Sequence, residues 1–255
     1  MKARSIDDIA KTEAEYWNEN KLDRRKIKKL RRHAFHYSYK RESKFLQEKV
    51  KHFNDKDVLE IGSHAWVSWI KGNATPKSLD CINISEVELE KGISNAKNIP
   101  FEINFHLMDA NTLTFKDEMF DVVYGGAILH HLDVKRSISE IYRVLKPNGI
   151  ILFTEPLNMN PFYKLYRYFN KKERTPDEHA LVNKDFKIIK EKFTFEHVFL
   201  DFFSVITGYL SLKIFGDKNY DNWINKIGYR LDVFFSKIPF LHVLFARVII
   251  YGTKK

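Results

Sequence analysis

The sequence predicts an α/β fold with a mostly parallel sheet and helices on both faces. From residue 57 onward, short apolar runs alternate with helical stretches, which is the pattern of repeated strand–helix–strand units. The chain has 255 residues, of which 44% are hydrophobic, so it can bury one substantial core. Residues 1–50 contain no glycine and are expected to be helical. We therefore expect a basic helical cap at 1–50 and one α/β domain at 51–255.

Five strands are predicted in the first half of the domain. Each is a short apolar run bounded by residues that favour turns. The predicted strands cover residues 57–62, 78–85, 103–109, 120–126 and 149–156. The helices between them are expected at about 66–72, 86–97 and 133–145. The last helix should end at "KPNG", because proline cannot continue a helix and Asn-Gly tolerates a positive φ.

The alternation breaks after Pro156. An insertion of a helix and a polar loop is expected at about 157–190. Two further strands are predicted near 194–206 and at 245–255, which brings the sheet to seven strands. A second, helical insertion at about 207–244 separates them. The sequence therefore predicts one domain with two insertions after its fifth strand.

Positive charge is concentrated near the N-terminus. The formal net charge is +10, and residues 21–32 hold eight Lys or Arg and one Asp. Apolar residues at near-helical spacing predict a basic amphipathic helix there. We favour a solvated helix packed on the main domain, and contact with an anionic membrane or with RNA remains an alternative. Nucleic acid is disfavoured because no RNA-binding signature accompanies the basic run.

Two apolar segments in the C-terminal part approach the length of a membrane span. Residues 193–212 and 233–251 both contain charged residues, which are costly at a bilayer centre, so neither is expected to span. Peripheral attachment remains open. The single cysteine, Cys81, and the absence of an apolar run at the start of the chain favour a reducing cytoplasm. A cytoplasmic protein, with a peripheral membrane location as the alternative, is expected.

Polar residues gather at the ends of the first four predicted strands. In an open α/β sheet, ligands bind beyond the carboxyl ends of the strands. Glu60 and Gly62 end the first strand, and Asn83, 23 residues after Glu60, is placed to bind a ribose diol. Asp109 follows the third strand, where it can accept a hydrogen bond from an adenine amino group. The sequence predicts a nucleotide-type cofactor crevice at this edge.

Five motifs in order extend this pattern into a family resemblance. Residues 57–156 resemble the class I S-adenosylmethionine-dependent methyltransferases, especially the small-molecule branch, whose fold is a Rossmann-like sheet of seven strands. The matching pieces are "VLEIG" (58–62), "INIS" (82–85), "MDANTLTF" (108–115), "FDVVYGGAILHHL" (120–132) and "VLKPNGIILFTEP" (144–156). "FARVIIYGTKK" (245–255) is similar to the final strand of that fold, and "RTPDEHAL" (174–181) to a segment of some bacterial members.

The resemblance implies a role for each matching position. Glu60 would orient the loop and the amino group of S-adenosylmethionine, and Gly62 and Ser63 would let the backbone approach it. Asn83 would hold the ribose, with Ile84 against the adenine. The remaining implied contacts are Asp109 with the adenine amino group, Ala110 with the ring edge, and Gly125 with the sulfonium. No metal is implied.

The chain departs from the family pattern at two places. His64 and Trp66 stand where the family has glycines, and a side chain there must point away from the cofactor or clash with it. Asn83 replaces the usual acid, so its hydrogen bond to a ribose hydroxyl lacks charge assistance. Either the cofactor is held differently or it is not held.

Three histidines are candidate general bases for the methyl acceptor. His130 and His131 follow the fourth strand, and His179 lies in the "RTPDEH" loop; packing or capping is the alternative for each. We expect O- or N-methylation of a small-molecule or lipid- or sugar-linked acceptor. A non-catalytic module that binds a partner or membrane through its basic face is the alternative, and RNA methylation is a third hypothesis.

Overall fold

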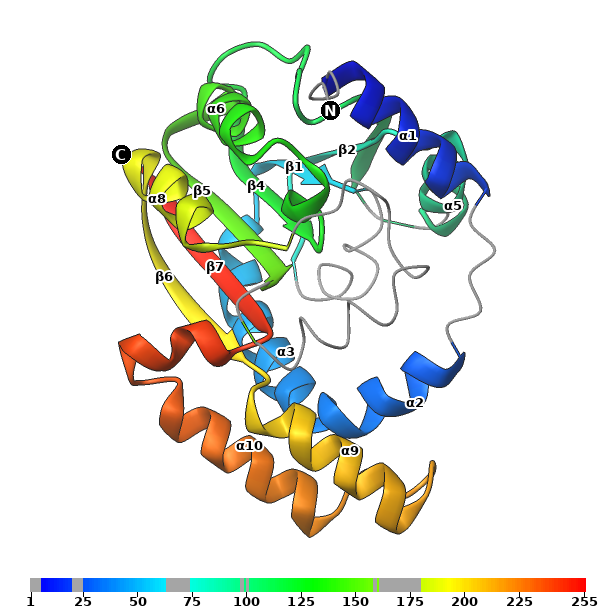
Figure 1. Ribbon diagram of the computed structural model, residues 1–255. Helices are drawn as coiled ribbons and strands as arrows, with labels where there is room; N and C mark the ends of the chain where they lie inside the picture. The colour runs from blue at the N-terminus through cyan, green and yellow to red at the C-terminus, as the bar shows by residue number, and fades with distance from the viewer. Residues whose placement is uncertain are drawn as a thin grey trace.

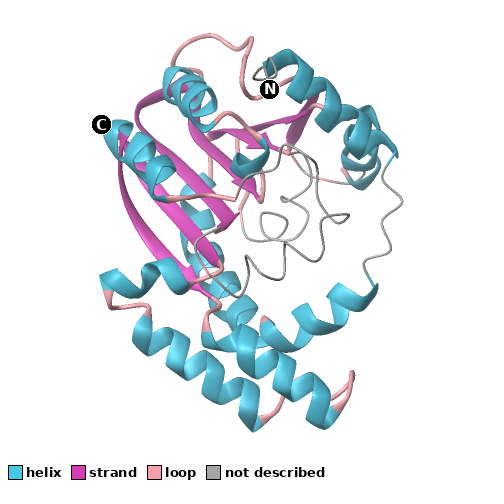
Figure 2. Cartoon of the chain, in the orientation of Figure 1, coloured by secondary structure: helices cyan, strands magenta, loops and turns pink. Residues whose placement is uncertain are grey.

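The sheet has seven strands, as expected from the sequence. The computed structural model describes residues 6–19, 25–62, 74–96, 99, 101–157, 160 and 180–255. The strand order is β3-β2-β1-β4-β5-β7-β6, with β7 antiparallel to both its neighbours and the other pairs parallel. The α/β prediction is confirmed (Figure 2). The strands are β1 (Asp57–Ile61), β2 (Ser78–Asn83), β3 (Glu102–Leu107), β4 (Phe120–Gly126), β5 (Leu145–Pro156), β6 (Phe193–Leu200) and β7 (Arg247–Lys254).

Helices precede, connect and follow these strands. Among the described residues, three α-helices and one 3-10 helix come before β1, and two α-helices and one 3-10 helix separate β6 from β7 (Figure 1). The α-helices are α1 (Ile6–Glu19), α2 (Arg25–Ala34), α3 (His36–Val50), α5 (Glu86–Asn95), α6 (Val134–Val144), α8 (Asn183–Lys192), α9 (Phe203–Phe215) and α10 (Trp223–Phe235). The short 3-10 helices are η1 (Lys51–Phe53), η2 (Leu129–His131) and η4 (Pro239–Leu244).

Apolar side chains fill both faces of the sheet. In β1, Leu59 and Ile61 pack on one face with α6 and α8, while Val58 packs on the other, as the two-residue period of a strand requires. Leu46 and Val50 of α3 belong to the second cluster. Figure 1 shows α3 behind the sheet and α6 and α8 in front of it. A sheet covered on both faces explains why its strands are nearly continuous apolar runs.

The N-terminal helices have different partners. α3 packs on the sheet, α2 packs on α9, and α1 packs on α5 beside the carboxyl ends of the strands. The domain boundary at residue 50 remains a prediction, but α3, which precedes it, contributes to the core of the sheet. α8, α9, α10 and η4 fall in or at the borders of the two predicted insertions, about 157–190 and 207–244.

Two predicted boundaries are wrong by several residues. The strand expected to reach residue 206 ends at Leu200, because Asp201 takes a left-handed φ of 68° and α9 begins at Phe203. β5 begins at Leu145 rather than 149. Its first residues pair with β4 across a register shift, and Asn148 has a φ of 59° within it. The helix predicted at 66–72 lies outside the described residues.

Among the residues that the structure describes, no helix is long and apolar enough to cross a membrane. α9, which covers residues 203–212 of the first apolar segment, has 13 residues. The second apolar segment, 233–251, is divided among the end of α10, η4 and β7.

Candidate active site

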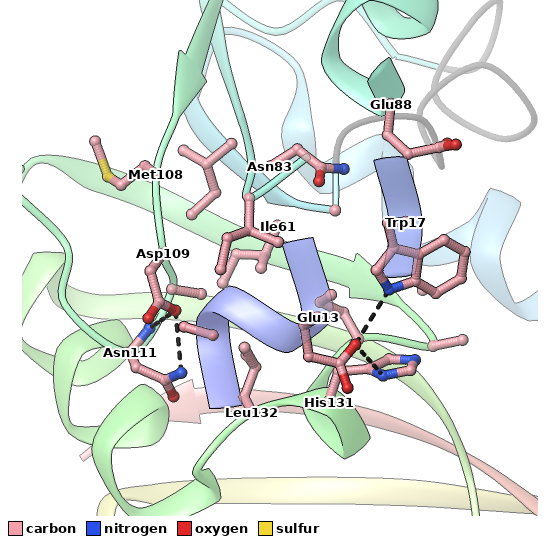
Figure 3. A pocket seen from close by; sticks show the side chains of 18 of the residues that line it. Glu13, Trp17, Ile61, Asn83, Glu88, Met108, Asp109, Asn111, His131 and Leu132 are labelled. Carbon is pink, nitrogen blue, oxygen red and sulfur yellow. Dashed lines mark hydrogen bonds and ion pairs between the residues drawn. The ribbon is translucent and has the colours of Figure 1, made fainter. Parts of the chain in front are cut away.

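A cavity of about 710 Å³ lies at the carboxyl edge of the sheet. The ends of β1 to β4 form its floor, and α1, α5 and the η2 segment form its walls (Figure 3). Six of the residues predicted from the sequence line it, from four different strand ends or loops. They are Gly62, Asn83, Ile84, Asp109, Ala110 and His131.

Gly62 and Gly125 are needed for different reasons. Gly62 directly follows β1 and has a φ of +100°, which L side chains rarely adopt, and its amide donates to the carbonyl of Ile82 at 2.9 Å. A Cβ at Gly125 would lie 2.7 Å from Cγ2 of Ile128 and 2.9 Å from the carbonyl oxygen of Ile61. Gly125 therefore lets Ile128 pack closely over β1 and β4, but it is not itself part of the described lining of the cavity.

Glu60 is buried beneath the site. Its side chain is fully inaccessible, and the thiol of Cys81 donates to its Oε2 at 3.3 Å. Burial, together with the Glu60 carboxylate, raises the pKa of Cys81, so the thiol stays protonated. Glu60 is not among the described residues that line the cavity. Its predicted contact with the cofactor remains a prediction, since residues 63–73, which follow the strand, lie outside the described part of the chain.

Asp109 is held in a fixed orientation by its own loop. Its Oδ1 accepts from the backbone amide of Asn111 at 2.9 Å and from the Asn111 side chain at 3.0 Å. The Asn111 Oδ1 in turn accepts from the amide of Asp133 at the start of α6, at 3.0 Å. A carboxylate anchored through one oxygen presents the other in a defined direction. Figure 3 shows Asp109 and Asn111 together at one end of the cavity.

Asn83 lies at the turn between β2 and α5. Its Oδ1 accepts from the Ser85 amide at 2.9 Å, and the Ser85 hydroxyl caps α5 by accepting from the Glu88 amide. The same hydroxyl donates to Asn18 of α1 at 2.7 Å. Glu88, one turn into α5, also lines the cavity and pairs with Lys91. The wall near Asn83 therefore carries a carboxylate that the sequence analysis did not identify.

Glu155 organises the segment after β4. Its Oε1 accepts from the amides of Ile128 and Leu129, at 2.9 and 2.8 Å, and its Oε2 lies 2.8 Å from Nδ1 of His130. Glu155 is only 2% exposed. The bend that precedes these amides needs a φ of 57° at Ala127. His130 is not among the described residues that line the cavity, and its role as a general base stays a prediction.

His131 faces a carboxylate from α1. Its Nδ1 lies 3.1 Å from Oε2 of Glu13, and the indole of Trp17 donates to the same oxygen at 3.2 Å. The Trp17 and His131 rings meet edge to face, with centroids 5.6 Å apart. Glu13 is only 4% exposed. All three residues line the cavity and point toward one another in Figure 3, so α1 closes the site with a Glu–His pair.

The remaining predicted residues lie outside the described part of the chain. Ser63, His64 and Trp66 follow β1, and His179 lies in the "RTPDEH" loop. Among the described residues, no group of three or more His, Cys, Asp or Glu side chains is arranged to hold a metal.

Sequence reasoning missed several residues that shape the site: Glu13, Trp17, Glu88, Asn111 and Glu155. Asn111 and Glu155 lie inside the quoted motifs, and their places just after strand three and at the end of strand five were available signals. No local pattern marks Glu13 or Trp17, because only the folded chain brings α1 to the strand ends.

The sequence of this region matches a known family. Residues 59–153 match the family model described as "Methyltransferase domain". The chain contains a class I methyltransferase domain. The matched residues run from β1 to β5 and include every strand end that borders the cavity.

A curated relative of this methyltransferase domain shows the extent of the similarity. Demethylmenaquinone methyltransferase of Symbiobacterium thermophilum is 37% identical over 90 residues, which cover 34% of this chain and 35% of that protein. The chain spans at most 41% of the length of the first three curated relatives it matches. These alignments therefore cover less than half of this chain and of each relative.

Solved structures extend the similarity of the fold to nearly the whole chain. Geranyl diphosphate C-methyltransferase from Streptomyces coelicolor aligns over 97% of this chain and 98% of its own, with a TM-score of 0.65 and 13% identity. The [4+2]-cyclase SpnF aligns over 84% of this chain and 80% of its own, with a TM-score of 0.51 and 15% identity. These likenesses confirm the Rossmann-like methyltransferase fold.

Proposed function

We propose that the protein binds S-adenosylmethionine in the cavity at the strand ends and transfers its methyl group to a small-molecule acceptor. The observation that carries this proposal is the convergence of Gly62, Asn83 and Asp109 on one cavity. These residues come from three separate motifs of the family pattern. A cavity of about 710 Å³ is in the usual range for a cofactor site.

The described residues fit the adenosine part of this cofactor. Asp109, oriented through Asn111, is placed to accept from an adenine amino group, and Ile84 and Ala110 offer apolar surface to the ring. Asn83 and Glu88 both line the cavity, and we propose that they face the ribose hydroxyls. Glu88 supplies the charged acceptor that Asn83 lacks.

His131 is the proposed general base. Bound S-adenosylmethionine supplies an electrophilic methyl group. The Glu13 carboxylate faces Nδ1 of His131 and favours the tautomer with the proton on that nitrogen, which leaves Nε2 with a lone pair. Nε2 accepts the proton that an acceptor hydroxyl or amine loses as its O or N atom bonds to the methyl carbon and the carbon–sulfur bond breaks. His130, bonded to Glu155, holds the segment that carries His131.

The acceptor is proposed to be a small or lipid-linked molecule with a hydroxyl or amine. Relatives whose names specify quinone or isoprenoid diphosphate substrates support the small-molecule class. Trp17 and Ile9 of α1 offer an apolar wall on the side of His131. We propose that the acceptor contacts this wall.

Calorimetric titration with S-adenosylmethionine tests the proposal directly. Wild-type protein is expected to bind it, and Asp109→Asn should weaken binding by about tenfold, because one hydrogen bond to a charged group is worth roughly 1.5–3 kcal/mol. Asp117→Asn, an exposed carboxylate that pairs with Arg143, is the matched control and should bind normally. Absence of binding at millimolar cofactor would leave the non-catalytic module as the better explanation.

A second reaction class has one specific observation in its favour. The fold is similar to that of a protein whose name specifies a [4+2] cyclisation. Proteins with this fold therefore include at least one that is not named as a methyltransferase. Cofactor binding without any methylated product, over a panel of hydroxyl and amine acceptors, would favour that class.

A further inference from the structure

The helices α9 and α10 expose large apolar side chains to solvent. Seven of the fourteen large apolar side chains exposed in the described residues lie on these two helices. Ile214, Trp223 and Phe234 are 63%, 64% and 62% exposed. We call the seven the outer face: Ile206, Tyr209, Leu210 and Ile214 of α9, and Trp223, Ile227 and Phe234 of α10.

The outer face of α9 is one continuous stripe. Its four members stand at positions i, i+3, i+4 and i+8, which lie on one side of a helix. Figure 1 shows α9 and α10 as the lowest helices of the molecule, with α2 and α3 above them. The two helices therefore form an outer layer, and the apolar stripe of α9 remains exposed on it.

The inward side of the same helices is small and polar, which reverses the usual arrangement of a surface helix. Its buried members are Ser204, Gly208 and Ser211 of α9, with Asn225, Gly228 and Asp232 of α10; Ile224 of α10 is the one large apolar residue buried with them. A Cβ at Gly208 would lie 2.5 Å from Cα of Ala34, and one at Gly228 would lie 2.0 Å from Oγ1 of Thr207. The helices approach so closely because these residues are glycines.

Hydrogen bonds connect several side chains of this polar interior. Oγ of Ser211 lies 2.8 Å from Nδ1 of His33 and accepts from Nδ2 of Asn222 at 2.6 Å. Asp232 accepts from the amides of Phe202 and Phe203, at 3.1 and 2.6 Å. Small residues and hydrogen bonds between helices, with large apolar residues outside, form the arrangement of helices that face lipid.

The exposed charges on the two helices are all positive. Lys213 lies on α9, and Lys226 and Arg230 lie on α10, whereas the pair's single acid, Asp232, is buried. The neighbouring helix α2 adds exposed basic residues, of which Lys29 and Arg32 already face Asp217 in the loop between the pair. An apolar face with only cationic residues beside it complements an anionic lipid surface. The same charges would repel each other across an interface between two copies of this face.

The helices are too short to cross a bilayer. A helix of 13 residues is about 20 Å long, against a hydrocarbon core of about 30 Å. We propose that the outer face of α9 and α10 binds the surface of an anionic phospholipid bilayer, with the apolar stripe inserted among the headgroups and the basic residues at phosphate level. The proposal does not depend on methyl transfer, since no residue of the outer face lines the cofactor cavity.

Sedimentation of the full chain with vesicles tests this surface. The protein should sediment with vesicles that contain phosphatidylglycerol and much less with vesicles of phosphatidylcholine alone. Ile214→Gln/Phe234→Gln should weaken binding by at least about tenfold, because two inserted apolar groups are lost. Lys226→Glu/Arg230→Glu should abolish the preference for phosphatidylglycerol. Leu107→Gln, 54% exposed on β3, is the matched control and should bind as wild type does.

Three outcomes would overturn the proposal. The first is equal sedimentation with both kinds of vesicle or with neither. The second is full binding by Ile214→Gln/Phe234→Gln. In the third, light scattering shows a wild-type dimer that the same double variant dissociates, and no vesicle binding occurs; a second copy then covers the face. As a control, the midpoint temperature of thermal unfolding is measured for each variant. A midpoint near that of the wild type would show that a loss of vesicle binding is not caused by a loss of the fold.

Discussion

At the scale of single residues, the site depends on partners that lie far apart in the chain. Glu13 belongs to α1 and His131 to the segment after β4, yet their side chains meet at 3.1 Å over the cavity. Trp17 donates to the same carboxylate. One oxygen of Glu13 thus both orients the proposed base and attaches α1 to the rest of the site. Loss of this carboxylate should affect chemistry and closure together.

Glu13→Gln is expected to lower methyl-transfer turnover by about 10- to 100-fold, because an amide no longer favours the reactive tautomer of His131. Backbone amides of α1 should also exchange with deuterium faster, since the charged contact to His131 is lost. Mass spectrometry of exchange and product formation from S-adenosylmethionine measure the two effects. Glu15→Gln changes an exposed carboxylate on the same helix and should alter neither. Unchanged turnover in Glu13→Gln would exclude a catalytic role for the pair.

At the scale of elements, much of the fold could be predicted from local pattern. The strands from β1 to β5 are buried apolar runs between turn residues, so their positions were readable, and the rule for strand ends placed Gly62, Asn83 and Asp109 at one cavity. The end of β6 was not readable, because it depends on the left-handed Asp201 and on distant Asp232, which accepts from the first amides of α9. Long-range contacts of this kind leave no local periodicity.

The orientation of helix α9 also could not be predicted from local sequence. Apolar residues of α9 are distributed around its whole circumference, so the sequence does not reveal which side is buried. The small residues at Ser204, Gly208 and Ser211 decide this, but only through contacts with α2 and α10. α1 likewise reads as an ordinary polar helix, although Glu13 and Trp17 complete the cavity.

Asp232 makes the stability of the helical pair depend on pH. Burial is the main cause that raises its pKa from 3.8 to about 6. A raised pKa in the folded state stabilises the protein at low pH, and this contribution is lost as the pH rises through about 6. Between pH 5 and 7.5 the loss should be about 1 kcal/mol.

Urea unfolding of wild type and Asp232→Asn at both pH values isolates this effect, because only the wild type titrates at that position. The wild type should gain stability relative to the variant as the pH falls from 7.5 to 5. A difference that is constant with pH, or that changes in the opposite direction, would contradict the assigned shift.

At the scale of the whole molecule, Arg247 joins three parts of the fold. It begins β7, its Nε donates to Asp201 at 2.6 Å, and its Nη1 donates to Glu42 of α3 at 2.6 Å. The rings of Phe35 and Tyr39 lie on the same guanidinium, with both centroids 4.8 Å away. The sheet, α3 and the start of α9 therefore share one ionic centre.

Arg247→Met should lower the free energy of unfolding by about 3–5 kcal/mol, because it leaves two poorly solvated carboxylates without a cation. Asp201→Asn in the same background should recover part of this loss. Chemical denaturation measures both, and Arg136→Met, an exposed arginine on α6, should change stability little. A loss below about 1 kcal/mol would mean that water solvates the carboxylates once the arginine is removed.

The position of β7 between β5 and β6 has a consequence for the chain while it is being synthesised. β7 follows α9 and α10 in sequence, so β5 and β6 have no partner along these edges until Arg247–Lys254 has left the ribosome. Unpaired strand edges invite association with other chains. A nascent chain whose residues up to Leu244 have left the ribosome, but whose β7 has not, therefore exposes two unpaired strand edges. It exposes the apolar side chains of α9 and α10 at the same time. This interval is where chaperones should matter most to its production.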